Sequence, residues 1–378
     1  MNKEPNKPLR VLYLLPPSET RLSGIGNLLQ DPDNPARYLF YGLDYFARSG
    51  VSVRHNLMRP LPWHDRFGGF FRQILSRMGA YSGDLEWLLP VWGELRHAEV
   101  IVAFSDRMVL PLLYLRLFGF LPRTPVLYLT MGLPEKIASF RNRLWKRLIL
   151  SELRRVDWIV PLSSVESRLI LEEGIDGNVQ FVRVGVDTNY YRPIELEETI
   201  DVCCIGADPY RDFFTLFATA KLLPDKSFLV VASNDHAKTF GEVPANVRVL
   251  VDIPMAEIRH LLATSRTVAI PVRQNSYSGG TTVMLQAMSM GRTVVANAIG
   301  ANAEGYGFID NENCIFFPVG DCNKLAEILG SLLGDDERRR AIGRKARSFI
   351  VENLSLETFH ASLLKMVDDI ASRNRGNK

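Results

Sequence analysis

The stretch that decides the fold is residues 267–300, which read TVAIPVRQNSYSGGTTVMLQAMSMGRTVVANAIG. Its first part, 267–272, is a short apolar run bounded by polar residues, which is typical of a buried parallel strand. The segment SGGTT at 278–282 then opens an apolar helix that ends near Gly291, and a second apolar strand covers 293–298. Strand, glycine loop, helix and strand in this order predict one βαβ unit.

The glycine loop of this unit has the properties of a phosphate site. A helix N-terminus carries unpaired N–H groups and the positive end of the helix dipole, and both favour an anion. Gly279 and Gly280 have no Cβ, so a ligand can approach the backbone closely, and Ser278, Thr281 and Thr282 add hydroxyl groups. An ordinary capped helix on a parallel sheet would show the same pattern, so the loop alone leaves both interpretations open.

The composition is that of a globular protein with large cores. The 378 residues are 47% hydrophobic and 23% charged, and a chain of this length predicts about two or three domains. The net charge of +3 does not indicate a nucleic-acid partner. The four cysteines show no CxxC spacing and are expected to be reduced thiols of a cytoplasmic protein.

Two further classes of feature are not expected. The N-terminus has no signal-peptide pattern, and no run of about 18 apolar residues predicts a membrane span. The histidines form no HxxxH pair, and Asp31-Pro32-Asp33 lies among turn residues, so no metal site is predicted.

Strands alternate with helices along the chain, which predicts parallel doubly wound sheets. The expected strands are 10–16, 51–55, 100–104, 126–130, 158–162, 179–184, 201–205, 227–232 and 247–250, besides those of the 267–300 unit. The expected helices include 36–49, 212–222, 255–263, 324–333 and 357–370, and a loop with Gly24 and Gly26 follows the first strand.

The acidic segment 194–199 (IELEET) is interpreted as a linker between two such sheets. The predicted fold class is therefore α/β, with two Rossmann-like doubly wound domains facing across a cleft. Their predicted bounds are 1–195 and 196–355, and a C-terminal helix at 356–378 is expected to cross back to the N-terminal domain. In such sheets ligands lie at the carboxyl ends of the strands.

Several segments, taken together, resemble glycosyltransferase family 4, the retaining sugar-nucleotide transferases of GT-B fold. They are RVDWIVPLS at 155–163, GVDTNYYRP at 185–193, GANAE at 300–304, DNENC at 310–314 and PVGD at 318–321. The central unit departs from the family, which usually carries two glutamates eight residues apart where Ser278 and Gln286 stand here. Residues 278–282 resemble instead a branch with Ser-Ala-Gly-Gln-Thr. Met131 stands where the family often has a histidine, and Ala207 where it has an arginine.

The resemblance implies a donor site in the C-terminal domain. It places the base near Ile253 and Pro254, the ribose at Gln286, and the diphosphate at Arg211 and the 278–282 loop. The expected donor-binding residues are Gly24, Gly26, Arg211, Ile253, Pro254, Arg273, Ser278, Gly279, Gly280, Thr281, Thr282 and Gln286.

The expected catalytic residue is Asp106, which follows a predicted buried strand on the predicted cleft side. Its carboxylate could accept a hydrogen bond from an acceptor hydroxyl or assist its deprotonation. An N-cap of the following helix is the alternative role.

The implied function is a retaining, metal-independent hexosyltransferase. It would move a sugar from a nucleotide sugar, linked to UDP or GDP, to a hydroxyl of a glycan or lipid-linked glycan, and would need no further cofactor. Two alternatives stay open: a catalytically inactive GT-B-like binding or scaffold protein, and a sugar-nucleotide 2-epimerase.

Two basic, amphipathic segments, 66–78 and 135–155, predict a possible peripheral contact with an anionic membrane on its inner face. The first has apolar residues at helical spacing and three arginines, and the second has seven basic residues against two acidic ones. A helix that faces the core and has a solvated basic face is the alternative for each. The apolar positions of the first segment are Phe67, Phe70, Phe71, Ile74, Leu75 and Met78.

Overall fold

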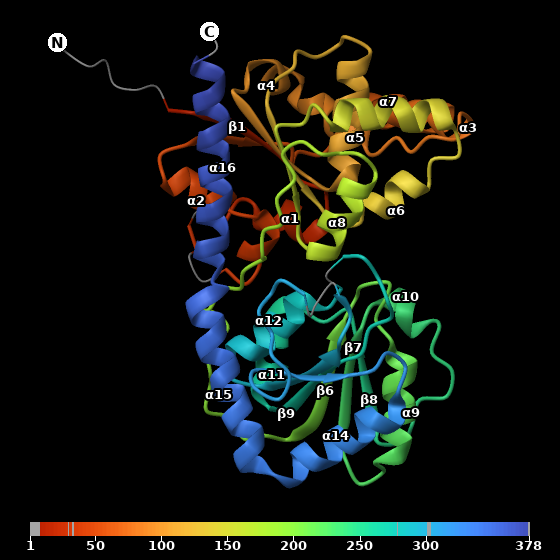
Figure 1. Ribbon diagram of the computed structural model, residues 1–378, viewed down its shortest axis with the longest axis vertical. Coiled ribbons are helices and arrows are strands. Elements are labelled where there is room, and N and C mark those ends of the chain that lie inside the picture. The colour runs from red at the N-terminus through yellow and green to blue at the C-terminus, as the bar shows by residue number, and fades with distance from the viewer. Residues whose placement is uncertain (1–7, 29, 32–33, 278, 301–303, 377–378) are drawn as a thin grey trace, which may run out of the picture. The chain divides into compact units, whose positions relative to one another are not determined.

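The computed structural model describes residues 8–28, 30–31, 34–277, 279–300 and 304–376 of the chain. The chain divides into two compact units (Figure 1). Unit 1 comprises Met1–Val182 and His360–Lys378, and unit 2 comprises Arg183–Phe359. Among the described residues, none of the helices has the length and apolar character needed to cross a bilayer.

Unit 1 is built on a five-stranded parallel sheet in the order β2-β1-β3-β4-β5. Its strands are β1 (Arg10–Leu14), β2 (Ser52–His55), β3 (Val100–Phe104), β4 (Val126–Thr130) and β5 (Trp158–Pro161). Its helices are α1 (Glu19–Gly24), α2 (Leu43–Arg48), α3 (Pro62–Arg77), α4 (Trp92–His97), α5 (Ser105–Leu117), α6 (Leu133–Ala138), α7 (Arg143–Leu153) and α8 (Ser164–Glu172), with short 3-10 turns η1 (Arg37–Phe40), η2 (Leu85–Trp87) and η3 (Leu89–Val91).

Unit 2 is built on a six-stranded parallel sheet in the order β11-β10-β9-β6-β7-β8. Its strands are β6 (Ile200–Gly206), β7 (Phe228–Ala232), β8 (Val247–Val251), β9 (Ser265–Ile270), β10 (Thr293–Asn297) and β11 (Ile315–Phe317). Its helices are α9 (Phe213–Leu222), α10 (Asn234–Ala237), α11 (Met255–Ala263), α12 (Thr281–Ser289), α14 (Cys322–Gly334) and α15 (Asp336–Asn353). The last helix, α16 (Leu356–Gly376), begins in unit 2 and continues in unit 1 from His360.

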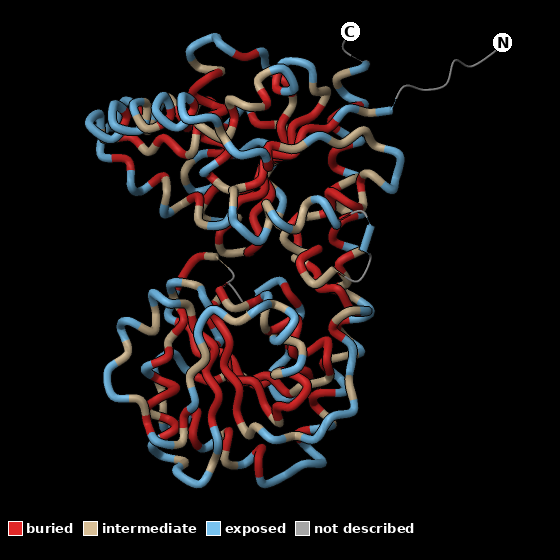
Figure 2. Tube along the Cα trace, turned by 180° about the vertical axis from the view of Figure 1, so that it is seen from behind, coloured by how far each residue is buried: buried red, intermediate tan, exposed pale blue. Residues whose placement is uncertain are grey.

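Each sheet is covered on both faces, which explains the apolar runs of the sequence. The central strands β3, β4 and β10 are buried at every position, and Figure 2 shows the buried residues concentrated along the strands. Helix α9 packs with α14, and α12 packs with α15. Such strands read as continuous apolar segments because neither face meets water.

Four sequence expectations need correction. The helix predicted over 36–49 is interrupted, because Tyr41 and Gly42 adopt positive φ angles of 48° and 89° between η1 and α2. The strand predicted over 179–184 is reduced to a single bridge between Ile159 and Val179. Gly24 ends helix α1, which Ser18 caps, rather than lying in a loop. The 135–155 segment forms two helices, α6 and α7, rather than one. In addition, the sequence analysis did not predict strand β11.

The segment that precedes β6 is held within unit 2. Val186 forms a bridge with Ser355, and the Arg347 guanidinium donates to the carbonyl oxygens of Thr188 (3.0 Å) and Tyr191 (3.2 Å). These contacts explain why residues from 183 onwards group with unit 2, whereas the composition change in the sequence lies near residue 195.

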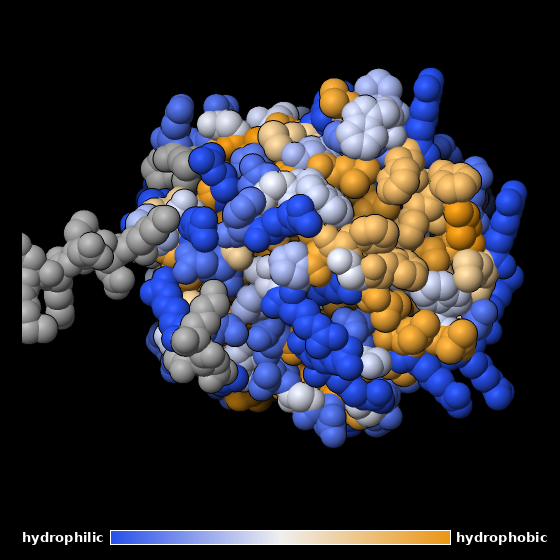
Figure 3. Space-filling model, turned by 90° about the horizontal axis from the view of Figure 1, so that it is seen from above, coloured by the Kyte–Doolittle hydropathy of each residue, from blue (hydrophilic) through white to orange (hydrophobic). Residues whose placement is uncertain are grey.

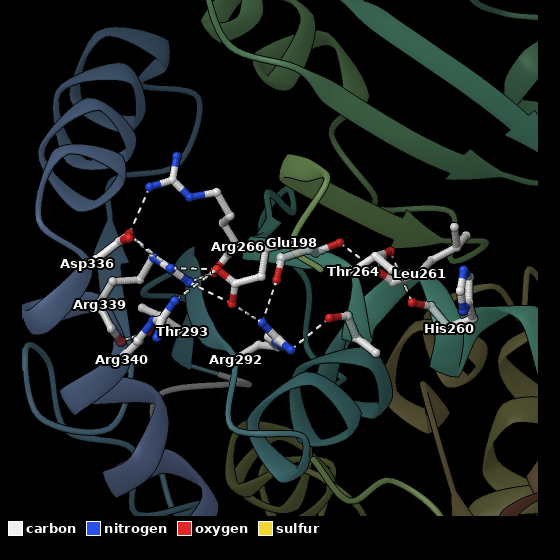
Figure 4. Close-up of polar contacts among 12 residues, drawn as sticks. Glu198, His260, Leu261, Thr264, Arg266, Arg292, Thr293, Asp336, Arg339 and Arg340 are labelled. Atoms are coloured by element: carbon white, nitrogen blue, oxygen red, sulfur yellow. Dashed lines mark hydrogen bonds and ion pairs between the residues drawn. The ribbon is translucent and has the colours of Figure 1, made fainter. Parts of the chain in front are cut away.

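An ion cluster anchors the acidic linker to unit 2 (Figure 4). The Glu198 carboxylate accepts hydrogen bonds from Arg292 and from Arg339, the latter at 2.7 Å. Asp336 pairs in turn with Arg266 at 2.8 Å and with Arg339 at 3.0 Å. Burial alone would raise the pKa of Glu198, but the hydrogen bonds and charges of Arg339 and Arg292 outweigh it and lower that pKa.

Candidate functional site

The strand order of unit 2 reverses between β6 and β9, so the loops that follow these two strands meet at the carboxyl edge of the sheet. Arg211, in the loop after β6, forms an antiparallel bridge with Val272, in the loop after β9. The Arg273 amide donates to the Tyr210 carbonyl at 2.8 Å. Parallel sheets bind ligands at such a reversal point, and this edge is therefore the first candidate site.

The glycine turn before α12 lies at this edge, and its geometry explains Gly280. Gly280 is the N-cap of α12 and has a φ of +81°, which few other residues adopt readily. A Cβ there would lie 2.7 Å from Ile270 Cγ2 and 3.2 Å from Arg211 Nη2. A Cβ on Gly279 would meet Asn275 and Asp208 only at 3.4 Å. Ser278 lies outside the described residues.

Arg211 lies beneath this turn rather than in solvent. Its side chain is 1% exposed, and its Nη2 lies 3.0 Å from Asp208 Oδ2. A Cβ on Gly206 would lie 2.2 Å from Arg211 Nε, so β6 ends in glycine where the guanidinium packs. Within the described part of the chain, Nη1 of Arg211 and Oδ1 of Asp208 are buried without a hydrogen-bond partner. The Arg211 charge is thus partly neutralised, and one donor remains unused.

The other predicted donor residues differ widely in exposure. Arg273 is exposed, and its Nη2 donates to the Pro209 carbonyl at 2.7 Å. Thr282 is exposed at the first turn of α12, whereas Thr281 and Gln286 are 1% and 2% exposed. Of the two predicted donor-binding arginines, Arg273 is therefore the exposed one and Arg211 the buried one. The sequence did not distinguish them in this respect.

A cavity of about 510 Å³ opens at the carboxyl ends of β6 and β7, within the size range of small-molecule sites. Arg211 and Arg273 line it, together with Phe213 and the α10 residue His236. The His236 ring nitrogen Nδ1 lies 2.8 Å from Ser233 Oγ. Sequence reasoning missed Ser233 and His236, although a Ser-x-x-His pattern directly after a strand is visible. Ile253 and Pro254 follow β8 and are not among the described residues that line this cavity.

The corresponding edge of unit 1 carries Asp106. The strand order reverses there between β1 and β3, and Ser105, the first residue after β3, has a φ of 60°. Asp106 is 7% exposed, and its carboxylate lies 3.5 Å from Lys136 Nζ, which lies 3.8 Å from the Tyr81 ring centroid. Burial raises the pKa of Asp106, although the Lys136 charge opposes this. Gly24 and Gly26 follow β1, and a Cβ on Gly26 would meet nothing within 4 Å.

Glu166 is a second buried carboxylate at this edge, and the sequence analysis missed it. Its Oε1 accepts hydrogen bonds from Thr130 Oγ1 (2.9 Å) and from the amides of Gly132 (2.7 Å) and Leu133 (3.0 Å). Its Oε2 is buried with no partner among the described residues. Burial raises the pKa of Glu166 to about 7, against the effect of these hydrogen bonds. The Ser163-x-x-Glu166 capping pattern would have marked the position.

A second groove, of about 790 Å³, lies beside the linker and is lined by Glu195, Glu198, Arg292 and Arg340 among others. Two of its arginines already pair with Glu198 (Figure 4). This groove lies near Arg292, at the amino end of β10, away from the edge where parallel sheets bind ligands. It is therefore the weaker candidate.

Comparison with protein families matches residues 200–335 to the family model described as "Glycosyl transferases group 1". The matched region contains the glycine turn, Arg211, Arg273 and the 510 Å³ cavity. Comparison with curated sequences gives no match.

Solved structures resemble this chain over nearly its whole length. Sucrose-phosphate synthase from Thermosynechococcus elongatus has a TM-score of 0.70 at 14% identity, covering 97% of this chain and 100% of that chain. The fold is therefore GT-B. HepE of Anabaena, solved in complex with UDP-glucose, has a TM-score of 0.67 at 16% identity and covers 96% of this chain and 100% of its own. A glycosyltransferase from Rickettsia africae has a TM-score of 0.61 at 14% identity, covering 96% and 99%.

In the described ranges, no three His, Cys, Asp or Glu side chains come together as a metal ion would require. The absence of a metal requirement stays a prediction.

Proposed function

We propose that this protein is a retaining glycosyltransferase that uses a nucleotide-sugar donor, linked to UDP or GDP, and a hydroxyl acceptor. The observation that carries the proposal is the anion-binding character of the carboxyl edge of unit 2. Two arginines line a cavity there, and the glycine turn at the N-terminus of α12 lies at the same edge, inside the segment that matches the glycosyltransferase family model.

The donor diphosphate would lie at the start of α12. Gly279 presents no Cβ to it, the first-turn amides of α12 would donate hydrogen bonds, and the Arg273 guanidinium would contribute charge. Arg211 supports the turn from below, and its unused Nη1 adds positive potential. As the sugar leaves, negative charge grows on the diphosphate, and fixed donors of this kind stabilise it. HepE, which shares the fold, is solved with UDP-glucose, and this supports a UDP-linked donor.

The acceptor hydroxyl would be bound by unit 1, with Asp106 accepting its hydrogen bond. The raised pKa of Asp106 makes the carboxylate a better proton acceptor than an exposed one. Glu166 would position the turn after β4, because it holds the amides of Gly132 and Leu133. We propose a glycan or lipid-linked glycan as the acceptor, a cytoplasmic location, and no metal or further cofactor.

A thermal-shift screen of the whole protein against UDP-, GDP-, ADP- and TDP-sugars tests the donor part, because ligand binding raises Tm by linkage. We expect one nucleotide class to raise Tm, and transfer to acceptor alcohols to follow with retention of the anomeric configuration, read by NMR of the product. Conversion of UDP-N-acetylglucosamine without any acceptor would identify a 2-epimerase instead. A Tm shift without turnover would identify a catalytically inactive binding or scaffold protein. The observation that motivates this alternative is that Met131 and Ser278 stand where the family often has a histidine and a glutamate.

A further inference from the structure

Helix α3 has two distinct apolar faces, and the core of unit 1 covers only one of them. Phe71 and Leu75 face inward, since Leu75 is 2% exposed and Phe71 packs against the hydrophobic core. Gly68 lies on the same side, where a Cβ would come within 3.0 Å of Glu86. This face accounts for the attachment of the helix to unit 1.

The second face is an exposed apolar stripe of Trp63, Phe67, Phe70, Ile74 and Met78, which we call the outer stripe. These residues are spaced by four, three, four and four positions, so they form one face of the helix. Their exposed fractions are 57%, 50%, 62%, 37% and 42%, respectively. Exposed apolar surface of this extent on one element indicates a binding face rather than scattered surface residues.

Further exposed apolar side chains lie on the elements that pack against α3. Ring contacts link α3 to α5 and α7: Phe71 to Tyr114 at 5.9 Å, Tyr114 to Trp145 at 5.7 Å, and Trp145 to Phe118 at 6.2 Å. At the surface of these elements Phe118, Phe120 and Leu144 are 49%, 57% and 63% exposed. Figure 3 shows apolar side chains gathered in one broad area, with strongly hydrophilic side chains at its margin.

Arginines border this apolar area. Arg66 and Arg77 are exposed next to the outer stripe, on the side away from the core face. Arg141, Arg143 and Arg147 are exposed at the start of α7, and the Arg141 amide bonds the Gly79 carbonyl at 3.0 Å, directly after α3. These five arginines form no ion pair with the described acidic residues.

Two other basic residues of the 135–155 segment are already neutralised. Lys146 pairs with Glu173 at 2.9 Å, and Lys136 pairs with Asp106. The acidic Asp65 falls outside the outer stripe. The charge available beside the apolar area is therefore positive, and it comes from arginines.

We propose that this face of unit 1, the outer stripe with Phe118, Phe120, Leu144 and the bordering arginines, docks on an anionic lipid bilayer. Aromatic and aliphatic side chains on a helix surface enter the interfacial region of a bilayer, while the bordering guanidinium groups meet anionic headgroups. A purely apolar face would suit a second copy of the chain, but two copies would bring these arginines toward one another. The inference is independent of the transferase proposal, because it concerns lipid binding alone.

Co-sedimentation of the full chain with vesicles tests the proposal. At low salt we expect binding to vesicles of 30% phosphatidylglycerol in phosphatidylcholine, and release by high salt because salt screens exposed charges. The triple variant F67S/F70S/I74S should lower the partition coefficient about 100-fold, since three exposed apolar side chains lose their burial in lipid. The matched control F214S/L222S removes side chains that are 59% and 49% exposed on α9 of unit 2, and it should bind like the wild type.

The contribution of the arginine charges and the insertion of Trp63 into the bilayer are tested separately. R141Q/R143Q/R147Q should lower binding to anionic vesicles by about fivefold per residue, whereas K221Q/R344Q/K345Q, which removes exposed charges of unit 2, should have little effect. Trp63 is the one exposed tryptophan of the chain's five, so vesicle binding should shift tryptophan emission to shorter wavelength in the wild type and not in W63F.

Three results would overturn the proposal. The first is no binding of the wild type to anionic vesicles at low salt. The second is equal binding by F67S/F70S/I74S when circular dichroism shows that the variant is folded. The third is a concentration-dependent dimer in sedimentation velocity that the triple variant abolishes, because the face would then belong to a second copy of the chain.

Discussion

The carboxyl edges of the two sheets have the same architecture and opposite electrostatics. In unit 2 the edge presents a glycine turn, the N-terminus of α12 and the exposed Arg273, with Arg211 beneath. In unit 1 the edge presents two buried carboxylates, Asp106 and Glu166, and both have raised pKa values. An edge of the first kind favours an anion, whereas one of the second kind favours hydrogen-bond donors. The difference teaches that loop residues, rather than the sheets, set the electrostatics of each edge.

The largest effect on stability is expected from Gly280→Val, which disrupts the glycine turn at the edge of unit 2. A branched side chain at a φ of +81°, with its Cβ 2.7 Å from Ile270, should lower the free energy of unfolding by about 3 kcal/mol or more and abolish diphosphate binding. Chemical denaturation measures the change. Gly241→Val, where a Cβ meets nothing within 4 Å, is the control and should cost far less.

Glu166→Gln tests the edge of unit 1 through pH. The unfolded carboxyl ionises near its ordinary pKa of 4.5, and the folded one near 7 because burial disfavours the charge. The contribution of the protonated Glu166 carboxyl to the free energy of unfolding is therefore fully present below pH 4.5 and is lost as the pH rises through 7. We expect the wild type to lose on the order of 3 kcal/mol of unfolding free energy relative to Glu166→Gln over this range. Identical pH profiles would show that Glu166 is not a strained, buried carboxylate.

Arg211 sharpens the comparison, because Asp208 and the proposed diphosphate would compete for its charge. Arg211→Ala should weaken nucleoside diphosphate binding by about 1.5–3 kcal/mol and leave nucleoside binding nearly unchanged. Asp208→Asn should act in the opposite direction, since it releases the guanidinium from its ion pair at 3.0 Å. Calorimetric titration measures both. Equal loss for nucleoside and diphosphate in Arg211→Ala would assign Arg211 to the fold alone.

The smallest effect is expected from Asp106→Asn. Donor binding should be unchanged, because the residue belongs to unit 1, while kcat/KM for transfer should fall about tenfold, which is about 1.4 kcal/mol. Steady-state kinetics with a soluble acceptor measures it. A loss of donor affinity without a change in kcat would contradict the division between the two edges.

Much of the fold was predictable because buried parallel strands are apolar runs of fixed length. The strands predicted at 100–104 and 126–130 and the helix at 255–263 have the bounds that the structure shows. The break at Tyr41 and Gly42 was not predictable, because the surrounding residues have helical spacing and only backbone angles reveal the interruption.

The site was less predictable because its chemistry depends on distant contacts. Glu166 accepts a hydrogen bond from the turn after β4, which lies more than thirty residues earlier in the chain. The capping pattern marks the position of Glu166, but no pattern in the sequence marks this turn as its partner. Arg211 was predicted as a phosphate ligand, but its burial against Asp208 is a tertiary property. For α3, spacing gave the apolar positions but not which of them the core covers, and Phe67, Phe70, Ile74 and Met78 are exposed while Leu75 is buried.

The central claim, that a diphosphate lies at the glycine turn of unit 2, is tested most directly by Gly279→Ala. Its Cβ would make only ordinary contacts, the nearest at 3.4 Å, so the variant should fold. On the proposed placement of the diphosphate, however, the added methyl group would occupy the space through which the phosphate approaches the backbone. The measurement is calorimetric titration with UDP or GDP, whichever raises Tm, and with the matching nucleoside. We predict that Gly279→Ala weakens diphosphate binding at least about tenfold, that nucleoside binding is unchanged, and that Gly241→Ala changes neither. Diphosphate affinity equal to that of the wild type in folded Gly279→Ala would contradict the account.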